Sequence, residues 1–425
     1  MKLAINGGQP VVENSIFHGF PNVDKQEILG ILECFERNRF SGFLAGDYDG
    51  GPAVIEFERL VKQSTGSEFA IAFDTWSNGI VAAMLSLGLE VGDEVIIAPY
   101  TMTSCATSII SCGAIPVFAD VCPDSGCLDP EDVKRKITDR TKAIFVVHLF
   151  GIPADMDKIM SIADEHDLFV FEDCAQAPMS YYKGRLCGTI GHVGGFSFTE
   201  SKHITCGEGG AAITNDKKIN NGMRYVRNHG EVGPVYKSIR DTTEYNYSVD
   251  VYGDSGILGY NFRMTEITAA FAQAQWEKLD CILEIKRKMV NYLIENLADV
   301  KHVKLMVPDY DHVPSWYNFP LRYVSTYGVS RETFVAALNA EGLHFACGYV
   351  PPLYKQEIYT TNKHWIIRDY AKHMDYNNPG CPIVERLYND ELITTLDIRL
   401  PYDMDHMKKI VEGIKKVCEN MEELL

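Results

Sequence analysis

Residues 194–210 read Gly-Gly-Phe-Ser-Phe-Thr-Glu-Ser-Lys-His-Ile-Thr-Cys-Gly-Glu-Gly-Gly and join a short apolar strand to one lysine, Lys202. An amine held near a buried strand end loses its proton more easily, because desolvation disfavours the ammonium. A free amine can attack a carbonyl and form a Schiff base. Most lysines beside a strand extend their ammonium to solvent instead, so this stretch alone leaves both roles open.

An acidic pair upstream of this stretch makes the chemical role more specific. The apolar run at residues 168–171 ends in Glu172 and Asp173. An acid at the end of a buried strand is costly unless a cationic group meets it. Pyridoxal phosphate (PLP) requires this combination, a lysine for the Schiff base and an acid that keeps the pyridine nitrogen protonated. The two stretches together predict a PLP site.

Composition excludes several other classes of protein. The chain has 425 residues, 46% hydrophobic and 23% charged, as expected of a globular protein with roughly two or three domains. Its net charge of -18 argues against nucleic-acid binding, which needs a basic face. The twelve cysteines show no CxxC and no recurring Cys/His spacing, so we interpret them as reduced thiols of a cytoplasmic protein and expect no metal. No apolar run approaches the length of a membrane span.

Apolar strands alternate with helical patterns between about residues 68 and 215. The predicted strands lie at residues 94–98, 115–121, 142–149, 168–172, 194–198 and 211–214. Near-continuous apolar strands separated by helices are typical of an α/β fold with a mainly parallel sheet. Ligands of such sheets bind at the carboxyl ends of the strands, where Asp173 and the loop to Lys202 lie.

The remaining segments predict a second, smaller domain. A long polar loop at residues 231–255 precedes a long helix at 263–297. We expect a large domain over residues 1–270, including the N-terminal segment, and a C-terminal α+β domain over 271–425, joined through that helix. Further elements are expected as helices at 25–36, from Pro52, at 331–339 and at 404–421, a strand at 317–323 and a loop at 40–52.

With these motifs in this order over nearly its whole length, the chain resembles the DegT/DnrJ/EryC1/StrS sugar aminotransferases. These are PLP enzymes of fold type I, with a mainly parallel sheet of the seven-stranded type. The motifs that carry the resemblance are Gly51-Pro-Ala-Val-Ile-Glu-Phe-Glu58, Gly92-Asp-Glu-Val95, Pro116-Val-Phe-Ala-Asp120, Val147-His-Leu-Phe-Gly151, Glu172-Asp-Cys-Ala-Gln-Ala177, Phe196-Ser-Phe198 with Lys202, Gly207-Glu-Gly-Gly210 and Gly259-Tyr-Asn-Phe-Arg-Met264.

The resemblance implies roles for individual residues. Lys202 forms the Schiff base and moves the catalytic proton, and Asp173 keeps the pyridine nitrogen protonated. Gln176 lies beside the ring hydroxyl and Ser197 binds the phosphate. Asn261 reaches the phosphate from a neighbouring subunit, which implies a homodimer with shared active sites. Singly, these residues have structural alternatives: a helix cap for Asp173, a strand hydroxyl for Ser197, and loop or turn residues for the other two.

Two positions depart from the family pattern. The family's Ser-Gly-Thr phosphate loop aligns with Thr75-Trp76-Ser77. Ser77 can still donate to a phosphate at the helix N-terminus, whereas Trp76 in the glycine's place limits how closely the backbone approaches. The aromatic residue that stacks on the pyridine aligns with Met102, with Tyr100 as an alternative cover and plain core as the structural alternative.

Four more residues are candidates for substrate contact because they lie in segments that touch substrate in relatives. They are Arg227, His229, Arg263 and Tyr349. Surface ion pairs or packing are the alternative roles for all four.

The lysine is kept at position 202, with His203 after it, which favours transamination over the dehydration of relatives that replace it with histidine. The predicted enzyme of amino sugar biosynthesis moves an amino group from glutamate or glutamine to a keto-sugar, commonly nucleotide-linked. The opening Asn-Gly-Gly-Gln-Pro at residues 6–10 and the extended segment before the last helix resemble the family branch that acts on cyclitols and aminohydroxybenzoate precursors. That resemblance implies, as the alternative, a glutamine:inosose-type cyclitol aminotransferase or an aminohydroxybenzoate-synthase-like enzyme. A PLP-dependent sugar dehydratase and a non-catalytic sensor are further alternatives.

Overall fold

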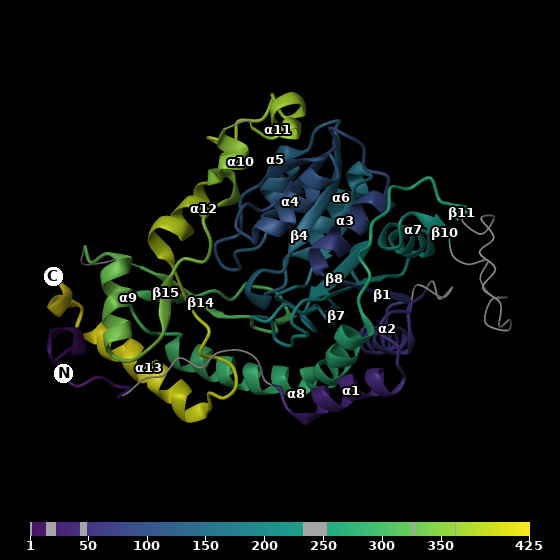
Figure 1. Cartoon of the computed structure of the whole chain (residues 1–425). Coiled ribbons are helices and arrows are strands. Elements are labelled where there is room, and N and C mark those ends of the chain that lie inside the picture. Colours follow the sequence, from purple (N-terminus) through teal and green to yellow (C-terminus); the bar gives the residue numbers. More distant parts are fainter. Residues whose placement is uncertain (1, 14–22, 43–48, 233–252, 325–327, 362) are drawn as a thin grey trace.

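The computed structural model describes residues 2–13, 23–42, 49–232, 253–324, 328–361 and 363–425 (Figure 1). Its centre is a seven-stranded sheet in the spatial order β1-β9-β8-β5-β4-β2-β3. Only β9 runs antiparallel to its neighbours, so the predicted mainly parallel sheet is confirmed. The strands are β1 (Phe69–Phe73), β2 (Glu94–Ile97), β3 (Ile115–Phe118), β4 (Thr141–Val147), β5 (Phe169–Asp173), β8 (Val193–Ser197) and β9 (Gly210–Thr214).

Helices cover this sheet, as the alternating pattern predicted. Helix α3 packs against β8 and β9, α4 against β3, α6 against β5 and α7 against β1. Helix α3 begins after Thr75, whose Oγ1 accepts the N–H of Asn78 at 3.2 Å. The helices of this part are α1 (Lys25–Glu36), α2 (Pro52–Thr65), α3 (Trp76–Ser86), α4 (Thr103–Ser111), α5 (Pro130–Lys136), α6 (Met156–His166) and α7 (Lys217–Arg227). None of the helices in the described ranges combines the length and apolar character needed to cross a membrane.

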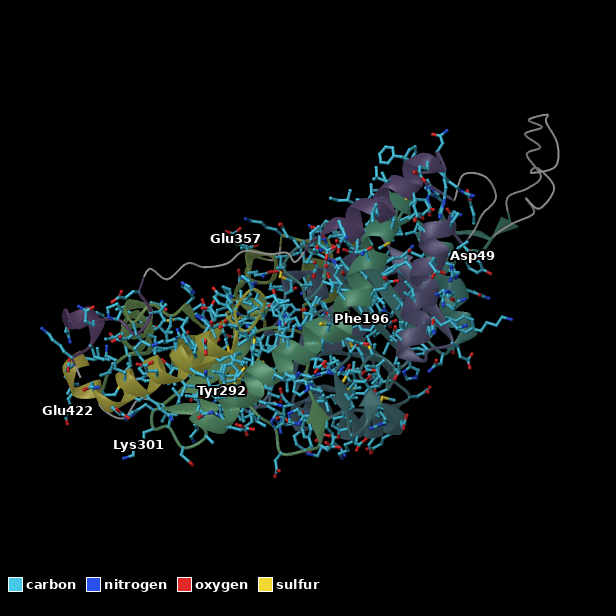
Figure 2. All side chains as sticks on the ribbon, turned by 90° about the horizontal axis from the view of Figure 1, so that it is seen from below. Asp49, Phe196, Tyr292, Lys301, Glu357 and Glu422 are labelled. Carbon is cyan, nitrogen blue, oxygen red and sulfur yellow. The ribbon has the colours of Figure 1, made fainter. Side chains whose placement is uncertain are left out.

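Helix α8 (Glu266–Leu297) joins the two parts of the molecule. It packs against α1 and α2 and also against α13 of the C-terminal part (Figure 1). In Figure 2, Tyr292 of α8 lies beside α13, while Phe196 of β8 lies farther along the same helix. Ring contacts of Trp276 with Phe196 (5.7 Å between centroids) and Phe57 (6.2 Å) anchor α8 on the large sheet.

The C-terminal part is α+β, as predicted. Its antiparallel sheet has the order β12-β14-β16-β15; α9 packs against β15, and α13 packs against α9 and α8. A further small sheet joins β13 (His312–Val313) to β6 (Tyr181–Tyr182) and β7 (Arg185–Leu186) of the large part. The C-terminal elements are β12 (Val303–Leu305), β14 (Phe319–Tyr323), α9 (Arg331–Ala340), β15 (Phe345–Cys347), α10 (Glu357–Thr360), α11 (Trp365–Tyr370), α12 (Pro382–Arg386), β16 (Leu392–Thr395) and α13 (Met404–Glu419).

The N-terminal segment lies on the C-terminal part, although the sequence analysis grouped it with the first domain. Buried Glu341 accepts the backbone N–H groups of Ala4 (2.9 Å) and Val11 (3.1 Å). Lys416 of α13 binds the same carboxylate at 2.7 Å and the carbonyl of Gln9 at 2.6 Å. A buried carboxylate needs such donors, and the segment supplies them across more than 300 residues of sequence.

Two predicted loops fall partly outside the described residues. Positions 43–48 of the 40–52 loop and positions 233–252 of the 231–255 loop are not described. At the ends of the second loop, β10 (Glu231–Val232) pairs with β11 (Gly253–Asp254).

Candidate active site

Asp173 ends β5 with a carboxylate that is almost wholly buried, at 4% exposure. Its Oδ1 accepts the indole N–H of Trp76 at 3.1 Å and the backbone N–H of Ala175 at 2.8 Å. Its Oδ2 accepts the thiol of Cys105 at 3.2 Å. A carboxylate offers about four acceptor positions, so Oδ2 keeps one that these three donors do not use.

Lys202 lies in the turn that follows β8. Its backbone N–H donates to the carbonyl of Thr199 at 3.0 Å, and its side chain is half-buried. The ammonium lies 4.9 Å from the centre of the Tyr317 ring, a cation–π distance. Tyr317 precedes β14, so a residue of the C-terminal part holds the lysine in place.

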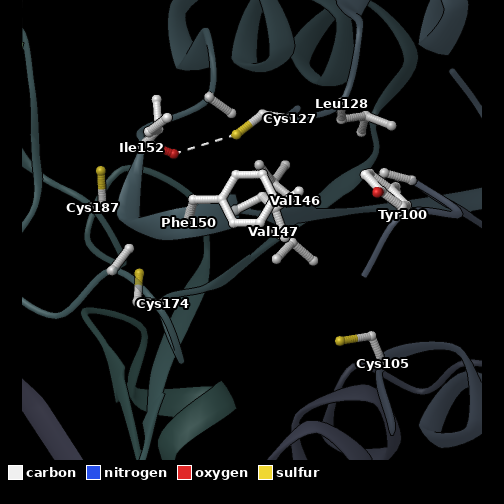
Figure 3. Packing of buried hydrophobic residues seen from close by; sticks show 14 of the residues in the cluster. Tyr100, Cys105, Cys127, Leu128, Val146, Val147, Phe150, Ile152, Cys174 and Cys187 are labelled. Atoms are coloured by element: carbon white, nitrogen blue, oxygen red, sulfur yellow. Dashed lines mark hydrogen bonds between the residues drawn. The ribbon is translucent and has the colours of Figure 1, made fainter. Parts of the chain in front are cut away.

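Asp173 and Lys202 act on one common neighbour, Cys105 of α4. Burial raises the pKa of the Cys105 thiol well above its usual range, the charge of Asp173 raises it further, and the charge of Lys202 lowers it. Figure 3 shows Cys105 and Tyr100 near the end of β4, where Val147 lies. Strands β5 and β8 are parallel neighbours, so Asp173 at the end of β5 and Lys202 in the turn after β8 lie at the same carboxyl edge of the sheet.

Gln176 and Tyr349 meet in the same region. The side chain of Gln176 accepts the N–H of Phe150 at 2.8 Å and donates to the Tyr349 hydroxyl at 2.8 Å. Burial raises the pKa of Tyr349, and the nearby Asp173 contributes in the same direction. Tyr349 follows β15, so it is a second residue of the C-terminal part that closes the site.

Ser77 and Ser197, the two serines predicted to bind the phosphate, lie at the start of α3 and at the end of β8. Ser77 is the second residue of α3, and Ser197 ends β8, where it pairs with Gly210. A side chain at Gly210 would meet the backbone nitrogen of Trp76 at 2.4 Å, so the start of β9 touches the start of α3. Both serines are half-buried, and the N–H groups of the helix N-terminus suit an anion.

Met102 and Tyr100 differ in exposure. Met102 caps the start of α4 with 55% of its surface exposed, which rules out a plain core role. Tyr100 is buried, and its hydroxyl accepts the N–H of Tyr349 at 3.0 Å. Of the two candidate covers, only Met102 presents its side chain to open space.

The structure contradicts a substrate contact for Arg227. Its side chain is fully buried and donates to Glu58 at 2.7 Å and to the carbonyl of Ala72 at 3.0 Å. The ion pair neutralises a carboxylate that α2 buries against β1. Arg227 therefore takes the structural role that was its alternative.

His229, Asn261 and Arg263 lie together in the segment after α7. His229 and Asn261 are exposed, and Arg263 donates to the side chain of Asn228 at 2.7 Å. Burial lowers the pKa of the Arg263 guanidinium. The carbonyl of Phe262 accepts the N–H of Asp74 at 3.0 Å, so this segment borders the turn between β1 and α3.

A buried group of metal-type ligands lies behind the site, formed by His148, Glu172 and Cys187. The Nδ1 of His148 accepts the N–H of Ala154 at 3.0 Å, so Nε2 carries the proton and donates to Glu172 at 3.0 Å. Backbone N–H groups within residues 188–191 fill the other positions of this carboxylate. These hydrogen bonds occupy both ring nitrogens of His148 and the carboxylate of Glu172.

Lys202 and Asp173 were predicted from the sequence, and Trp76 was predicted as a cofactor-binding residue of the phosphate loop. The hydrogen bond from Trp76 to Asp173 was not predicted, nor were the contacts of Cys105 and Tyr317 with the acid and the lysine. The size of Trp76 was the available signal, because a buried indole needs a partner for its N–H. The donor set suits PLP: an amine, an acid with a spare acceptor position, and two hydroxyls beside a helix N-terminus.

Comparisons with known proteins agree with this fold. The profile of the DegT/DnrJ/EryC1/StrS aminotransferase family matches residues 36–390. A relative from Streptoalloteichus tenebrarius, named putative L-glutamine:3-amino-2,3-dideoxy-scyllo-inosose aminotransferase, is 31% identical over 100% of this chain and 99% of its own. A relative of the same name from Streptomyces kanamyceticus is 28% identical over 100% and 98%. A solved aminotransferase structure from Psychrobacter cryohalolentis has a TM-score of 0.82 and 26% identity, covering 96% of this chain and 100% of that one.

Proposed function

The chain belongs to the DegT/DnrJ/EryC1/StrS aminotransferase family, whose members use PLP, and we propose that it transfers an amino group from L-glutamine or L-glutamate to the keto group of an inosose-type cyclitol. The amino-transfer step rests on one observation: Asp173 ends β5, and Lys202 lies in the turn after the neighbouring parallel strand β8, at the same edge of the sheet. The choice of a cyclitol rests on the two full-length relatives with inosose aminotransferase names. Keto-sugars, commonly nucleotide-linked, are the acceptors first predicted from the sequence, and they form the competing arm of the test below.

PLP supplies an aldehyde and an electron-accepting ring when it is bound. Lys202 would hold the cofactor through its amine and would move the proton at the donor Cα. Asp173 would accept the ring N–H at the open position of Oδ2, and Ser77 and Ser197 would bind the phosphate.

Residues of the C-terminal part complete this site. Tyr317 keeps the Lys202 ammonium over its ring, which limits the directions in which the amine can point. Gln176, fixed by Phe150 and Tyr349, is proposed to lie beside the ring hydroxyl. Met102 is proposed to cover the cofactor face with a thioether in place of the usual aromatic ring.

Replacing Lys202 with alanine tests the amino-transfer step. The wild-type protein loaded with PLP is mixed with L-glutamine or L-glutamate without an acceptor, and release of the 2-oxo acid is followed. We expect stoichiometric release from the wild type and none from Lys202→Ala, while the surface variant Lys183→Ala behaves as the wild type. Release by Lys202→Ala at the wild-type rate would refute the role of Lys202.

A panel of acceptors tests the substrate class. The amino-loaded enzyme is offered scyllo-inosose, amino-dideoxy inososes and nucleotide-linked keto-sugars, and aminated products are identified by mass. We expect amination of the inososes. Amination of the nucleotide-linked sugars alone, or loss of water from a sugar without a new amine, would contradict the cyclitol proposal.

A homodimer is also part of the proposal, and α1 supports it. Ile28, Leu29, Leu32 and Phe35 are each at least 50% exposed and lie on the face of α1 turned away from α8. Exposed apolar stripes of this kind mark protein interfaces. A second copy that covers the stripe would also place exposed groups such as Asn261 near the other subunit's site.

Sedimentation equilibrium of two α1 variants tests the dimer. We expect Leu32→Lys to shift the protein toward the monomer and to lose activity with it, whereas Gln26→Lys, on the flank of the helix, stays dimeric. A Leu32→Lys protein that sediments as the wild type does would exclude α1 from the interface. The twelve free cysteines, all within the described residues, support the proposed cytoplasmic location.

A further inference from the structure

Trp76 is the first residue of α3, and its side chain turns inward rather than toward solvent. The residue is 6% exposed, and its indole N–H donates to Oδ1 of Asp173 at 3.1 Å. The N–H of Ala175 fills the second acceptor position of the same oxygen. With both positions of Oδ1 taken, only Oδ2 can meet a further ligand.

Two glycines, Gly195 and Gly79, make room for the indole, and a third, Gly210, makes room for the backbone of Trp76. A side chain at Gly195 would lie 2.0 Å from Cη2 of Trp76, and one at Gly79 would lie 2.6 Å from Cε3. A side chain at Gly210 would meet the backbone nitrogen of Trp76 at 2.4 Å. These separations are far shorter than van der Waals contact, so the indole ring is closely packed and has little freedom to move.

The most confining of these glycines is also the sheet neighbour of the acid. Gly195 on β8 pairs directly with Asp173 on β5, and the N–H of Cys174 donates to the Gly195 carbonyl at 2.9 Å. The indole therefore spans from the glycine on one strand to the carboxylate on the next. Its position is fixed by the sheet rather than by a loop.

We propose that Trp76 is a positioning residue for Asp173, a role that rests on the proposed aminotransferase function. The indole N–H and the Cys105 thiol hold the two carboxylate oxygens from different directions, α3 and α4. Together they fix the rotation of the carboxylate so that the free position of Oδ2 faces the cofactor's ring nitrogen. The tryptophan that departs from the family's glycine thus supplies a donor that glycine could not.

Trp76→Phe removes the donor and keeps an aromatic ring in the same place. The matched control is Trp276→Phe, which removes another buried indole N–H, the one that donates to Ser64 at 3.0 Å. We expect Trp76→Phe to slow 2-oxo acid release from L-glutamine by about tenfold, the loss typical of one hydrogen bond to a charged group. We also expect it to shift the pH midpoint of the bound cofactor's visible spectrum, which a purely structural role would not move. Trp276→Phe should change neither quantity.

Gly195→Ala gives an independent test with Trp76 intact. The added methyl group displaces the indole from Asp173, so we expect the same direction of spectral shift and a weaker affinity for PLP in titrations followed by fluorescence. A folded Gly195→Ala or Trp76→Phe protein with the wild-type spectrum and rate would overturn the positioning role. Failure of the wild type itself to bind PLP or react with any amino acid would instead overturn the proposed function.

Discussion

Glu172 and Asp173 are neighbours on β5 and both are buried, but they differ in how many of their acceptor positions are occupied. Glu172 accepts four hydrogen bonds, from Nε2 of His148 and from three backbone N–H groups within residues 188–191, at 2.6 to 3.0 Å. Asp173 accepts three, from Trp76, Ala175 and Cys105. Successive residues of a strand point to opposite faces, so the two carboxylates serve different surroundings.

The difference shows what separates a structural carboxylate from a functional one here. Glu172 is saturated, and its bonds tie the turn after β7 to the centre of the sheet. Asp173 is equally well buried but keeps one position free, at the edge of the sheet where ligands bind. Burial alone does not distinguish them; the count of donors does.

The largest expected effect comes from Asp173→Asn, which keeps the shape of the side chain and removes its charge. An amide cannot hold the ring nitrogen protonated, so we expect 2-oxo acid release to slow by about 10³-fold, the scale of losing a preorganised electrostatic partner. The unfolding free energy should change by less than about 1 kcal/mol, because no charge is left unpaired. Rapid-mixing kinetics and urea denaturation measure the two quantities. The control is Asp157→Asn, which changes a surface carboxylate. A rate loss of similar size in this control would contradict a specific role for Asp173.

Glu172→Gln should show the reverse pattern. The new amide points an N–H₂ group at backbone donors that need an acceptor, so we expect the unfolding free energy to fall by about 3 kcal/mol. Protein that remains folded should bind PLP with the wild-type spectrum. Urea denaturation with Glu165→Gln as the exposed control measures the loss. Unchanged stability in Glu172→Gln would show that the four hydrogen bonds do not hold the turn.

Much of this arrangement was predictable from the sequence. Apolar runs bounded by turns located most strands of the large sheet, and the end of such a run located Asp173. The order of motifs then connected Asp173 to Lys202. Strand β1 (Phe69–Phe73) was not predicted as a separate strand, since its alternating alanines give a weak apolar signal.

Other features depend on contacts that no local pattern encodes. Arg227 was a substrate candidate, and its burial follows from Glu58, 169 residues away in sequence. The Trp76–Asp173 bond depends on the space at Gly195, which exists only once β8 lies beside β5. The N-terminal segment binds Glu341, which lies more than 300 residues away in sequence, so no local pattern predicts that contact.

Two buried lysines differ as the two buried carboxylates do, in how well their side chains are partnered. Replacing them is expected to change the unfolding free energy by an amount between those of the other predictions. Lys416 has Glu341 at 2.7 Å, whereas among the described residues the one hydrogen-bond partner of Lys286 of α8 is the Tyr317 carbonyl at 3.4 Å. Burial lowers the pKa of Lys286 to about 7, and the charge of Arg399 adds to the shift. The unfolded lysine keeps its ordinary pKa of 10.5, so the unfolded state binds more protons between these values. The unfolding free energy therefore rises with pH between about 7 and 10.5. Below this range the destabilisation caused by burying Lys286 is complete.

Lys286→Met removes the destabilisation that results from burying a charged lysine. We expect it to stabilise the protein by about 2 kcal/mol near pH 6 and by much less near pH 10. The matched variant Lys416→Met should instead destabilise, because it leaves the buried Glu341 carboxylate without its cation. Thermal unfolding across this pH range measures both. If the stability of the wild type and of Lys286→Met depends on pH in the same way, protonation of Lys286 does not destabilise the fold.

The smallest expected effect concerns Gln176, a neutral group that, like Glu172, has its partners in place. Tyr349→Phe removes the hydroxyl that accepts the Gln176 amide at 2.8 Å, while the bond from Phe150 N–H to the other end of that side chain remains. One neutral hydrogen bond is worth about 1 kcal/mol, so we expect a roughly fivefold slower reaction with L-glutamine and no change in fold. The exposed Tyr370→Phe is the control. A rate loss close to that of Asp173→Asn would mean that the Tyr349 hydroxyl itself takes part in proton transfer. Loss of one hydrogen bond to the Gln176 amide cannot account for so large an effect.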